Sequence, residues 1–296
     1  MKKNKLIIFS YAIPLFIISR KIYKLLKRES ERNKLKDSVV IITGASEGIG
    51  KELAIEFAKQ GSKIVLASRS IDKLQKVENQ LKEKYVNCEA ISVPTDVSRK
   101  EDCINLIETT LEKFNKIDIL INNAGIVTYD YFYNTSDEEI KKIMDVNYWG
   151  VIHCTKAVLP YMMKNKKGRI VNISSFVGKR AMPGMLAYSS SKFAIQAIGE
   201  GLRAELRKYG IKVTTICPTA TKTELLSNAL SKRVKFSQNI GMSANRVAKE
   251  TINAMLENKR EHIIGIPEKI FLFTNNFFAS FYDFVLSFAP KFMLKD

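Results

Sequence analysis

A tyrosine and a lysine, Tyr188 and Lys192, stand four positions apart in the stretch AYSSSKFAIQ (residues 187–196), which otherwise has the pattern of a helix. Residues at i and i+4 share one helical face, so the ammonium can stand near the phenol. A free tyrosine titrates near pH 10, and lowering its pKa by about three units takes roughly 4 kcal/mol of phenolate stabilisation. A neighbouring cation supplies such stabilisation. The spacing therefore indicates a proton donor and the charge that tunes it; the alternative is two ordinary residues of one helix.

Glycines gather in IITGASEGIGKELA (residues 41–54), between an apolar run and a helical pattern. Glycine at such a turn lets the backbone approach a pyrophosphate, and the helix N-terminus offers free N–H donors. The spacing is G-x-x-x-G-x-G instead of the commoner G-x-G-x-x-G, and any strand-to-helix turn can require a glycine. Its place in the first βα unit predicts a dinucleotide site. The residues expected to bind the cofactor here are Gly44, Ser46, Gly48, Ile49 and Gly50.

The next apolar run ends in LASRS (residues 66–70), where an acid would meet the free ribose hydroxyls of NAD(H) and a cation would meet a 2′-phosphate. Arg69 stands there and no acid does, so we expect NADP(H), because a guanidinium matches phosphate bidentately. NAD(H) is the alternative. Glu47 in the glycine loop is unfavourable to an additional phosphate, and a solvated Arg69 is the simpler interpretation.

Asp96 lies in PTDVSRKE (residues 94–101). Ser98 and Glu101 have the spacing of a capping box, which would leave the Asp96 carboxylate free. We expect Asp96 to accept a hydrogen bond from the adenine amine.

Short β-branched runs alternate with helical periodicity from residue 38 onward. Strands are predicted at 38–44, 62–68, 88–94, 117–123, 169–175, 211–218 and 262–266, and helices at 49–60, 71–84, 98–114, 148–164 and 186–208. The strand runs are continuously apolar, as parallel strands covered on both faces are. We therefore expect an α/β fold: a Rossmann-like, doubly wound parallel sheet of about seven strands in the order 3-2-1-4-5-6-7, with helices on both faces and a ligand crevice at the carboxyl ends of the strands.

Further motifs follow in order: NNAG (residues 122–125), Asn147 in MDVNYWG, Ser175 in NISS, and the Tyr188-x-x-x-Lys192 pair. With the glycine loop, they make the sequence closely resemble the classical short-chain dehydrogenase/reductase family, over about residues 38–266. The resemblance implies an oxidoreductase in which Tyr188 exchanges a proton with a carbonyl or alcohol oxygen.

The resemblance also assigns the remaining roles. In the family the catalytic serine usually precedes the tyrosine by thirteen residues, which selects Ser175 over Ser174 to orient the substrate oxygen. Asn147 resembles the family asparagine that holds a water in the proton relay to Lys192. Tyr188 and Lys192 are also expected to contact the cofactor, with Lys192 on the nicotinamide ribose. In NNAG, the cofactor contacts would come from Asn123, Ala124 and Gly125, whereas Asn122 is expected to be more structural.

After the sixth predicted strand the family commonly shows Pro-Gly followed by a threonine, and here the sequence is CPTATKTE (residues 217–224). Pro218 and Thr223 match, but Thr219 replaces the glycine. Thr221 and Thr223 are expected to offer hydroxyls to the nicotinamide amide or the diphosphate, with Pro218 beside them. The alternative is an ordinary threonine-containing loop.

The net charge of +18 is concentrated near the start of the chain, where residues 1–38 hold eleven lysines and arginines against three acidic residues. This cluster adjoins the apolar run 6–19, and no nucleic-acid motif accompanies it. The run is too short for an ordinary span, since fourteen residues reach roughly 21 Å. We expect an uncleaved membrane attachment with the catalytic domain facing the cytoplasm; the alternative is a segment packed on the protein's own surface.

Three regions are thus expected: a hydrophobic anchor with a basic segment (1–37), the catalytic domain (38–266) and an aromatic tail (267–296). The tail holds eight of the 16 phenylalanines, namely Phe271, Phe273, Phe277, Phe278, Phe281, Phe284, Phe288 and Phe292. With a polar stripe at Asn276, Ser280, Asp283 and Ser287, they predict an amphipathic helix that lies at the bilayer, lines the substrate entrance or contacts another subunit. Leu225, Leu226, Ala229 and Leu230 make an apolar stripe suited to a lid.

By analogy, these features favour a membrane-associated reductase of a 3-oxoacyl chain, a ketosphingoid base or a steroid-type ketone. The competing interpretations are an NAD-linked alcohol dehydrogenase of the same family and a non-catalytic, membrane-tethered NADP-binding sensor or scaffold. Family members commonly form dimers or tetramers, so a homo-oligomer is expected. The four dispersed cysteines and two histidines do not indicate a metal site or disulfides.

Overall fold

The computed structural model describes residues 28–224 and 241–288. The apolar run at 6–19, the lid residues Leu225, Leu226, Ala229 and Leu230, and Phe292 lie outside the described residues.

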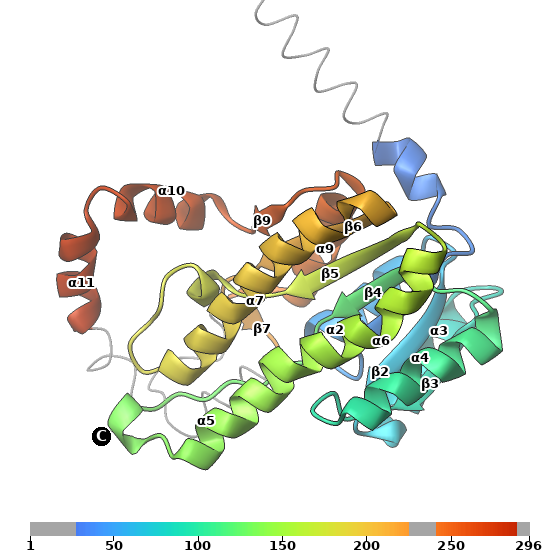
Figure 1. The fold of residues 1–296 in the computed structure, drawn as a ribbon, viewed down its shortest axis with the longest axis horizontal. Coiled ribbons are helices and arrows are strands. Elements are labelled where there is room, and N and C mark those ends of the chain that lie inside the picture. Colours follow the sequence, from blue (N-terminus) through green and yellow to red (C-terminus); the bar gives the residue numbers. More distant parts are fainter. Residues whose placement is uncertain (1–27, 225–240, 289–296) are drawn as a thin grey trace, which may run out of the picture.

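A seven-stranded sheet forms the centre of the molecule (Figure 1), in the order β3-β2-β1-β4-β5-β6-β9 with every neighbouring pair parallel. This confirms the predicted order, because β9 is the seventh strand of this sheet. The strands are β1 (Val39–Thr43), β2 (Lys63–Ser68), β3 (Ala90–Pro94), β4 (Ile119–Asn122), β5 (Gly168–Ile173), β6 (Ile211–Cys217) and β9 (Glu261–Ile263). A separate short pair joins β7 (Thr221–Lys222) to β8 (Met242–Ser243).

Helices cover both faces of the sheet. The helices α2 (Gly48–Ala58), α3 (Ile71–Lys84) and α9 (Ala244–Leu256) pack on one face, where Val40 and Ile42 of β1 point. The helices α4 (Lys100–Phe114) and α6 (Gly150–Lys164) pack on the other face, where Val39 and Ile41 point. Alternate residues of one strand thus enter two different cores, which explains why the strand sequences are apolar without alternation.

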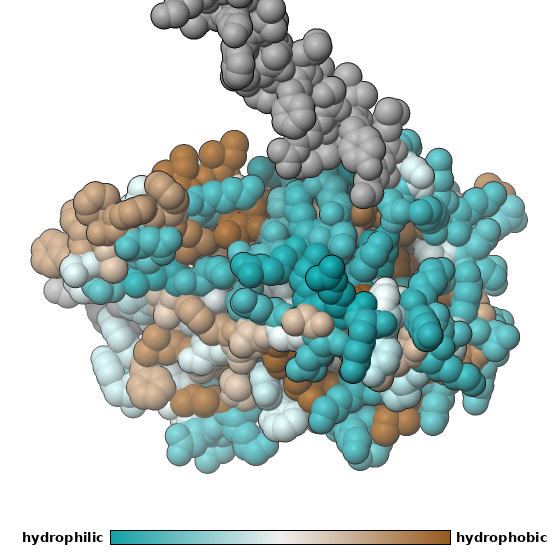
Figure 2. Space-filling view, turned by 45° about the horizontal axis from the view of Figure 1, so that its top comes forward, coloured by the Kyte–Doolittle hydropathy of each residue, from teal (hydrophilic) through white to brown (hydrophobic). Residues whose placement is uncertain are grey.

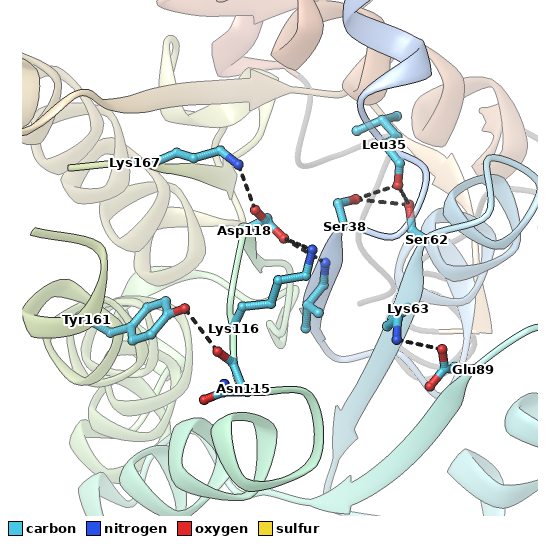
Figure 3. A network of polar contacts seen from close by, with 11 residues as sticks. Leu35, Ser38, Ser62, Lys63, Glu89, Asn115, Lys116, Asp118, Tyr161 and Lys167 are labelled. Atoms are coloured by element: carbon cyan, nitrogen blue, oxygen red, sulfur yellow. Dashed lines mark hydrogen bonds and ion pairs between the residues drawn. The ribbon is translucent and has the colours of Figure 1, made fainter. Parts of the chain in front are cut away.

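A network of polar contacts fixes the amino end of β1 (Figure 3). The Ser38 and Ser62 hydroxyls both donate to the Leu35 carbonyl, at 2.7 and 2.8 Å. Asp118 accepts from the Val39 N–H at 3.1 Å and pairs with Lys116 and Lys167. Burial opposes ionisation of Asp118, but the Val39 N–H and the two lysines hold the pKa of its carboxyl below the usual value.

Several elements differ from the sequence prediction. The expected capping box of Ser98 and Glu101 does not form: α4 begins at Lys100, and the Ser98 N–H and hydroxyl both donate to Asp96 Oδ1, at 3.0 and 2.7 Å. Asp96 is therefore partly engaged by its own turn. The sequence prediction also lacked α9 and α5 (Asp137–Met144), although Ser243 and Ser136 accept the N-terminal capping bonds typical of such helices.

The aromatic tail forms two helices instead of the single amphipathic helix predicted, α10 (Ile266–Asn275) and α11 (Ala279–Ser287). The break follows Asn275 and Asn276, and asparagine has low helix propensity. The Phe271 and Tyr282 rings meet at 4.5 Å across the turn, and the Thr274 and Tyr282 hydroxyls lie 2.8 Å apart. Among residues 28–224 and 241–288, no helix combines the length and the apolar character that crossing a bilayer would take.

Candidate active site

A cavity of about 620 Å³ opens at the carboxyl ends of the strands, where the order of the sheet reverses between β1 and β4. It is lined by fifteen of the seventeen residues that the sequence analysis selected: Gly44, Ser46, Gly48, Ile49, Arg69, Asp96, Asn123, Ala124, Gly125, Ser175, Tyr188, Lys192, Pro218, Thr221 and Thr223. Gly50 and Asn147 lie outside the lining and support residues that belong to it.

The glycine loop connects β1 to α2 in a backbone conformation that suits a phosphate. Gly44 and Gly48 have φ angles of +65° and +56°, which side-chain-bearing residues rarely adopt. A Cβ on Gly50 would lie 2.2 Å from the Gly44 carbonyl oxygen. Only glycine at this position therefore allows α2 to lie so close to the loop. The N-cap residue Glu47 makes no side-chain capping bond, which leaves the first N–H groups of α2 to a ligand.

The NNAG segment joins the end of β4 to the end of β1. The Asn123 side-chain amide donates to the Thr43 and Gly44 carbonyls at 2.9 and 3.1 Å, and the Thr43 hydroxyl accepts from the N–H groups of Asn123 and Ala124. Thr43, which the sequence analysis passed over, thus holds two carboxyl ends together. Asn122 is buried and donates to Asn172 at 2.9 Å, consistent with the structural role expected of it.

The outer end of the cavity is polar and charged. Arg69 follows β2, is exposed and lines the cavity. The pKa of the nearby Asp96 carboxyl is lowered: burial raises it, but the hydrogen bonds from Ser98 and, to a smaller extent, the charge of Arg69 lower it. Glu47 pairs with Lys73 of α3 at 2.8 Å, which compensates the negative charge in the glycine loop. Lys73 also lines the cavity and was not selected from sequence.

Asn147 is fully buried in a single π-helical turn, Asp145–Trp149, a feature that often marks functional sites. Its side chain accepts from the Ile126 N–H at 2.8 Å and donates to the Ile126 carbonyl at 2.9 Å and the Ser191 hydroxyl at 3.0 Å. These bonds fix the loop after NNAG against α7 (Leu186–Glu205). The side chain is thereby engaged with protein atoms, so a role in holding water would fall to other atoms of this turn.

Ser175 and Tyr188 meet at the inner end of the cavity. Ser175 follows β5 in extended backbone, and its hydroxyl accepts from the Val177 N–H at 3.3 Å. Tyr188, in the first turn of α7, is only partly buried and lines the cavity. Burial of the phenol raises the pKa of Tyr188 to about 12, although a hydrogen bond with the Ser175 hydroxyl acts to lower it.

Lys192 lies below Tyr188, with Nζ 5.6 Å from the centre of its ring. The ammonium is buried and donates to the Ile173 carbonyl at 2.9 Å. Desolvation lowers the pKa of Lys192 to about 8, so the amine remains mostly charged at neutral pH. The expected acidic phenol is therefore not produced by this pair alone. Burial is the largest influence on the pKa of Tyr188 and raises it, and the ammonium is bound to a carbonyl on the strand and not to the phenol oxygen.

An apolar wall lies beside Tyr188 in the cavity and packs against it. Tyr129, Val177 and Met185 are buried together, and Val127, Tyr131, Phe176 and Met182 pack against them. Six of these seven line the cavity itself: Val127, Tyr129, Phe176, Val177, Met182 and Met185. The sequence analysis missed this wall; the aromatic run TYDYFY after NNAG was the available signal.

The loop after β6 closes the remaining side. Pro218 accepts a hydrogen bond from the Phe176 N–H at 2.8 Å, and the Thr221 hydroxyl donates to the Thr219 carbonyl at 2.9 Å. The methyl group of Thr223 would lie 3.0 Å from a Cβ on Gly48, so this loop packs on the glycine loop. Thr219 is not among the five described non-glycine residues with positive φ, which explains why the turn accepts threonine in place of glycine.

Comparison with known proteins agrees with this geometry. The sequence profile of the short chain dehydrogenases matches residues 38–234. The chain is 35% identical to human dehydrogenase/reductase SDR family member 7 over 252 residues, which cover 81% of this chain and 73% of the relative.

Two solved structures share the fold and were determined with a nicotinamide dinucleotide. A 3-ketoacyl-(acyl-carrier-protein) reductase from Brucella melitensis complexed with NADH has a TM-score of 0.70 at 26% identity, over 77% of this chain and 96% of that one. ElxO with NADP bound has a TM-score of 0.68 at 30% identity, over the same shares.

Proposed function

The chain belongs to the short chain dehydrogenase family, and from that premise we propose that it is an NADP(H)-dependent oxidoreductase that reduces a ketone on a hydrophobic, lipid-like substrate. The observation that carries the proposal is a single cavity, in which the glycine loop, the pair Tyr188 and Ser175, and an apolar wall all meet. The reverse oxidation of a secondary alcohol would use the same groups.

The residues fit a dinucleotide. Gly44, Gly48 and the N-terminus of α2 would hold the diphosphate, and Lys192 and Thr221 stand where the nicotinamide half would lie. When bound, the reduced nicotinamide supplies a hydride for the carbonyl carbon.

Tyr188 would donate its proton to the carbonyl oxygen, which takes up the electron pair of the C=O bond, and the Ser175 hydroxyl would orient that oxygen. The raised pKa keeps Tyr188 protonated at neutral pH, as an acid for ketone reduction must be. Lys192 would stabilise the phenolate that remains, because it is cationic and lies next to the ring.

The charges at the outer end of the cavity support NADP(H) over NAD(H). Arg69 and Lys73 are both near the position expected for a ribose phosphate, and the pairing of Lys73 with Glu47 reduces the repulsion that Glu47 would otherwise exert.

The apolar wall supports a substrate of low polarity, such as a 3-oxoacyl chain, a ketosphingoid base or a steroid-type ketone. The Brucella reductase, by its name, acts on 3-ketoacyl chains. We further propose that the basic, apolar segment 1–37 attaches the protein to a membrane with its domain on the cytoplasmic side, and that the protein is a homodimer or homotetramer.

Replacing Tyr188 by phenylalanine tests the catalytic role. The variant is expected to bind NADPH as the wild type does and to lose about 10²- to 10⁴-fold in turnover of a ketone, because only the proton donor is removed. A panel of ketones is tested with both proteins, and turnover is measured as the rate of NADPH consumption. Tyr161→Phe is the matched control, since its hydroxyl lies on the surface and donates to the Asn115 carbonyl at 3.4 Å. Equal turnover in the Tyr188→Phe protein and the wild type would refute the mechanism.

A further inference from the structure

The helices α10 and α11 carry apolar side chains on the surface that they turn to solvent. Ile266, Ile270, Phe273 and Phe277 recur at spacings of 4, 3 and 4 residues, and each is between 58% and 72% exposed. Ile266, Ile270 and Phe273 share one face of α10, and Phe277 lies in the turn that follows this helix. Phe278, Phe281, Phe284, Val285 and Phe288 extend the exposed set over α11. We call these nine residues the aromatic ridge; Figure 2 shows it as a brown patch at the upper left.

The ridge is held in place by contacts on its inner side. Phe271 of α10 meets Tyr282 of α11 and also Phe176, at ring-centre distances of 4.5 and 5.6 Å. Arg180 forms an ion pair with Asp283. The two helices thus pack inward through one set of side chains and present another set outward. A contiguous exposed apolar surface of this kind usually marks an interaction site.

The inner contacts lead directly to the active site. Phe176 follows Ser175 in the chain and lines the cavity beside Tyr188, and Phe271 packs against it from the outside. The aromatic ridge and the apolar wall of the cavity are therefore joined through the pair Phe271 and Phe176.

The surroundings of the ridge favour a lipid surface over a second copy of the chain. Lys269 lies on α10, and the whole chain has a net charge of +18, so two copies would repel one another whereas anionic headgroups would be attracted. In Figure 1, α10 and the start of the described chain at Arg28 lie along the same edge of the molecule, the top in that view. Residues 1–27, with the apolar run 6–19, precede Arg28 in the sequence.

We propose that the aromatic ridge docks on the membrane surface, as a second contact besides the N-terminal segment, and that it delivers an apolar ketone from the bilayer to the cavity past Phe271 and Phe176. Phenylalanine and isoleucine side chains would enter the headgroup boundary while Lys269 meets anionic phosphates. The inference rests on the proposed membrane attachment and on the proposed apolar substrate.

A reporter within the ridge tests the docking. Trp149 is the only tryptophan, and it lies between α5 and α6 in the sequence. In Figure 1, α5 lies at the bottom of the molecule and α10 at the top. The full-length chain with Trp149→Phe and Phe277→Trp therefore has a single tryptophan in the ridge. Vesicles of phosphatidylcholine and phosphatidylserine with brominated acyl chains are expected to quench its fluorescence, because bromine acts only at short range. The wild type, with Trp149 alone, is the control and should not be quenched.

Co-sedimentation with the same vesicles separates the outcomes. Sedimentation with quenching at position 277 supports docking. Sedimentation without quenching contradicts docking of the aromatic ridge and agrees with attachment through the N-terminal segment alone. A chain that does not sediment overturns both, while its NADPH turnover still reports on the oxidoreductase proposal. A spectral blue shift at position 277 that grows with protein concentration in the absence of vesicles, together with no quenching in their presence, would instead identify an interface between copies.

Substrate delivery is tested by Phe273→Ser combined with Phe277→Ser. For a long-chain ketone embedded in vesicles, KM is expected to rise about tenfold with kcat little changed, because two aromatic rings that would enter the bilayer are removed. For a short, water-soluble ketone, kcat and KM should both remain at wild-type values. An equal loss for both ketones would show a structural defect and contradict delivery through the ridge.

Discussion

The polar side chains at the amino ends of the strands differ from those at the carboxyl ends in how fully they are engaged by other protein groups. At the amino ends, Ser38, Ser62 and Asp118 are satisfied by one another, by backbone and by lysines (Figure 3). At the carboxyl ends, Arg69 is exposed, the buried Ser68 hydroxyl has no hydrogen-bond partner among residues 28–224 and 241–288, and Lys192 is charged despite its burial. Polar residues at one end stabilise the sheet, and those at the other are left available to a ligand. Substitutions should therefore affect stability at the amino ends and function at the carboxyl ends.

Among the variants that compare the two ends of the strands, Gly50→Ala is expected to have the largest effect. The new Cβ would lie 2.2 Å from the Gly44 carbonyl oxygen. Overpacking of this kind costs about 1–3 kcal/mol, and the glycine loop would shift to avoid the clash. NADPH affinity, measured by the fluorescence of the bound nucleotide, should fall about tenfold to hundredfold. Gly201→Ala is the matched control, because a Cβ there meets nothing within 4 Å. Equal NADPH affinity in the Gly50→Ala protein and the wild type would contradict the assignment of the cradle.

At the amino end, Asp118→Asn should act on stability alone. It removes the carboxylate that accepts from the Val39 N–H and pairs with Lys116 and Lys167, at a cost of about 1–3 kcal/mol in the free energy of unfolding. Because the folded pKa is lowered, the contribution is present at neutral pH and is lost as the pH falls below about 4. Denaturant unfolding at several pH values measures this. Turnover per folded molecule should not change; a loss would contradict the separation of the two ends.

Lys192→Met should reveal the cost of a charge buried for function. The folded pKa of about 8 is below the unfolded value of about 10.4, so between these values the unfolded chain binds more protons and the stability of the wild type rises with pH. The wild type should gain roughly 1–3 kcal/mol relative to Lys192→Met between pH 8 and 10, measured by denaturant unfolding without cofactor. Tyr188, with a pKa of about 12, contributes little change in this window. A difference independent of pH would show that Lys192 is not desolvated.

Arg69→Ala should have the smallest effect, since Arg69 is exposed and solvent screens its interaction with a cofactor phosphate. NADPH affinity should fall about tenfold while NADH affinity is retained. Arg207→Ala is the same substitution near the amino ends of the strands and should change neither. An unchanged preference for NADPH in the Arg69→Ala protein would show that Arg69 does not bind the 2′-phosphate, and Lys73 would become the candidate for that contact.

The sequence predicted the sheet and the convergence of the motifs well, for a physical reason. Strands buried on both faces are continuously apolar, and residues that follow parallel strands, such as Gly44, Asn123 and Ser175, must gather at one edge. Tyr129 and Met185 were missed because their loops are positioned by packing against one another and not by a local pattern. The raised pKa of Tyr188 was also missed, since the spacing of tyrosine and lysine shows that they share a face but not how deeply each is buried.

Local signals failed where two interactions competed for the same group. Ser98 has the spacing of a capping residue, but its N–H and hydroxyl are taken by Asp96. In the aromatic tail, the pairing of Phe271 with Tyr282 accompanies a break that the periodicity of the phenylalanines does not reveal.

The most direct test of the central claim follows one hydrogen atom. NADPH deuterated at the transferable position of nicotinamide C4 is incubated with the wild-type protein and an apolar ketone, and the alcohol is analysed by mass spectrometry and NMR. If the cavity brings the cofactor and Tyr188 to one carbonyl, the carbinol carbon carries the deuterium and the Tyr188→Phe protein forms almost none of this product. Deuterium released to water, or equal labelling with both proteins, would contradict the account.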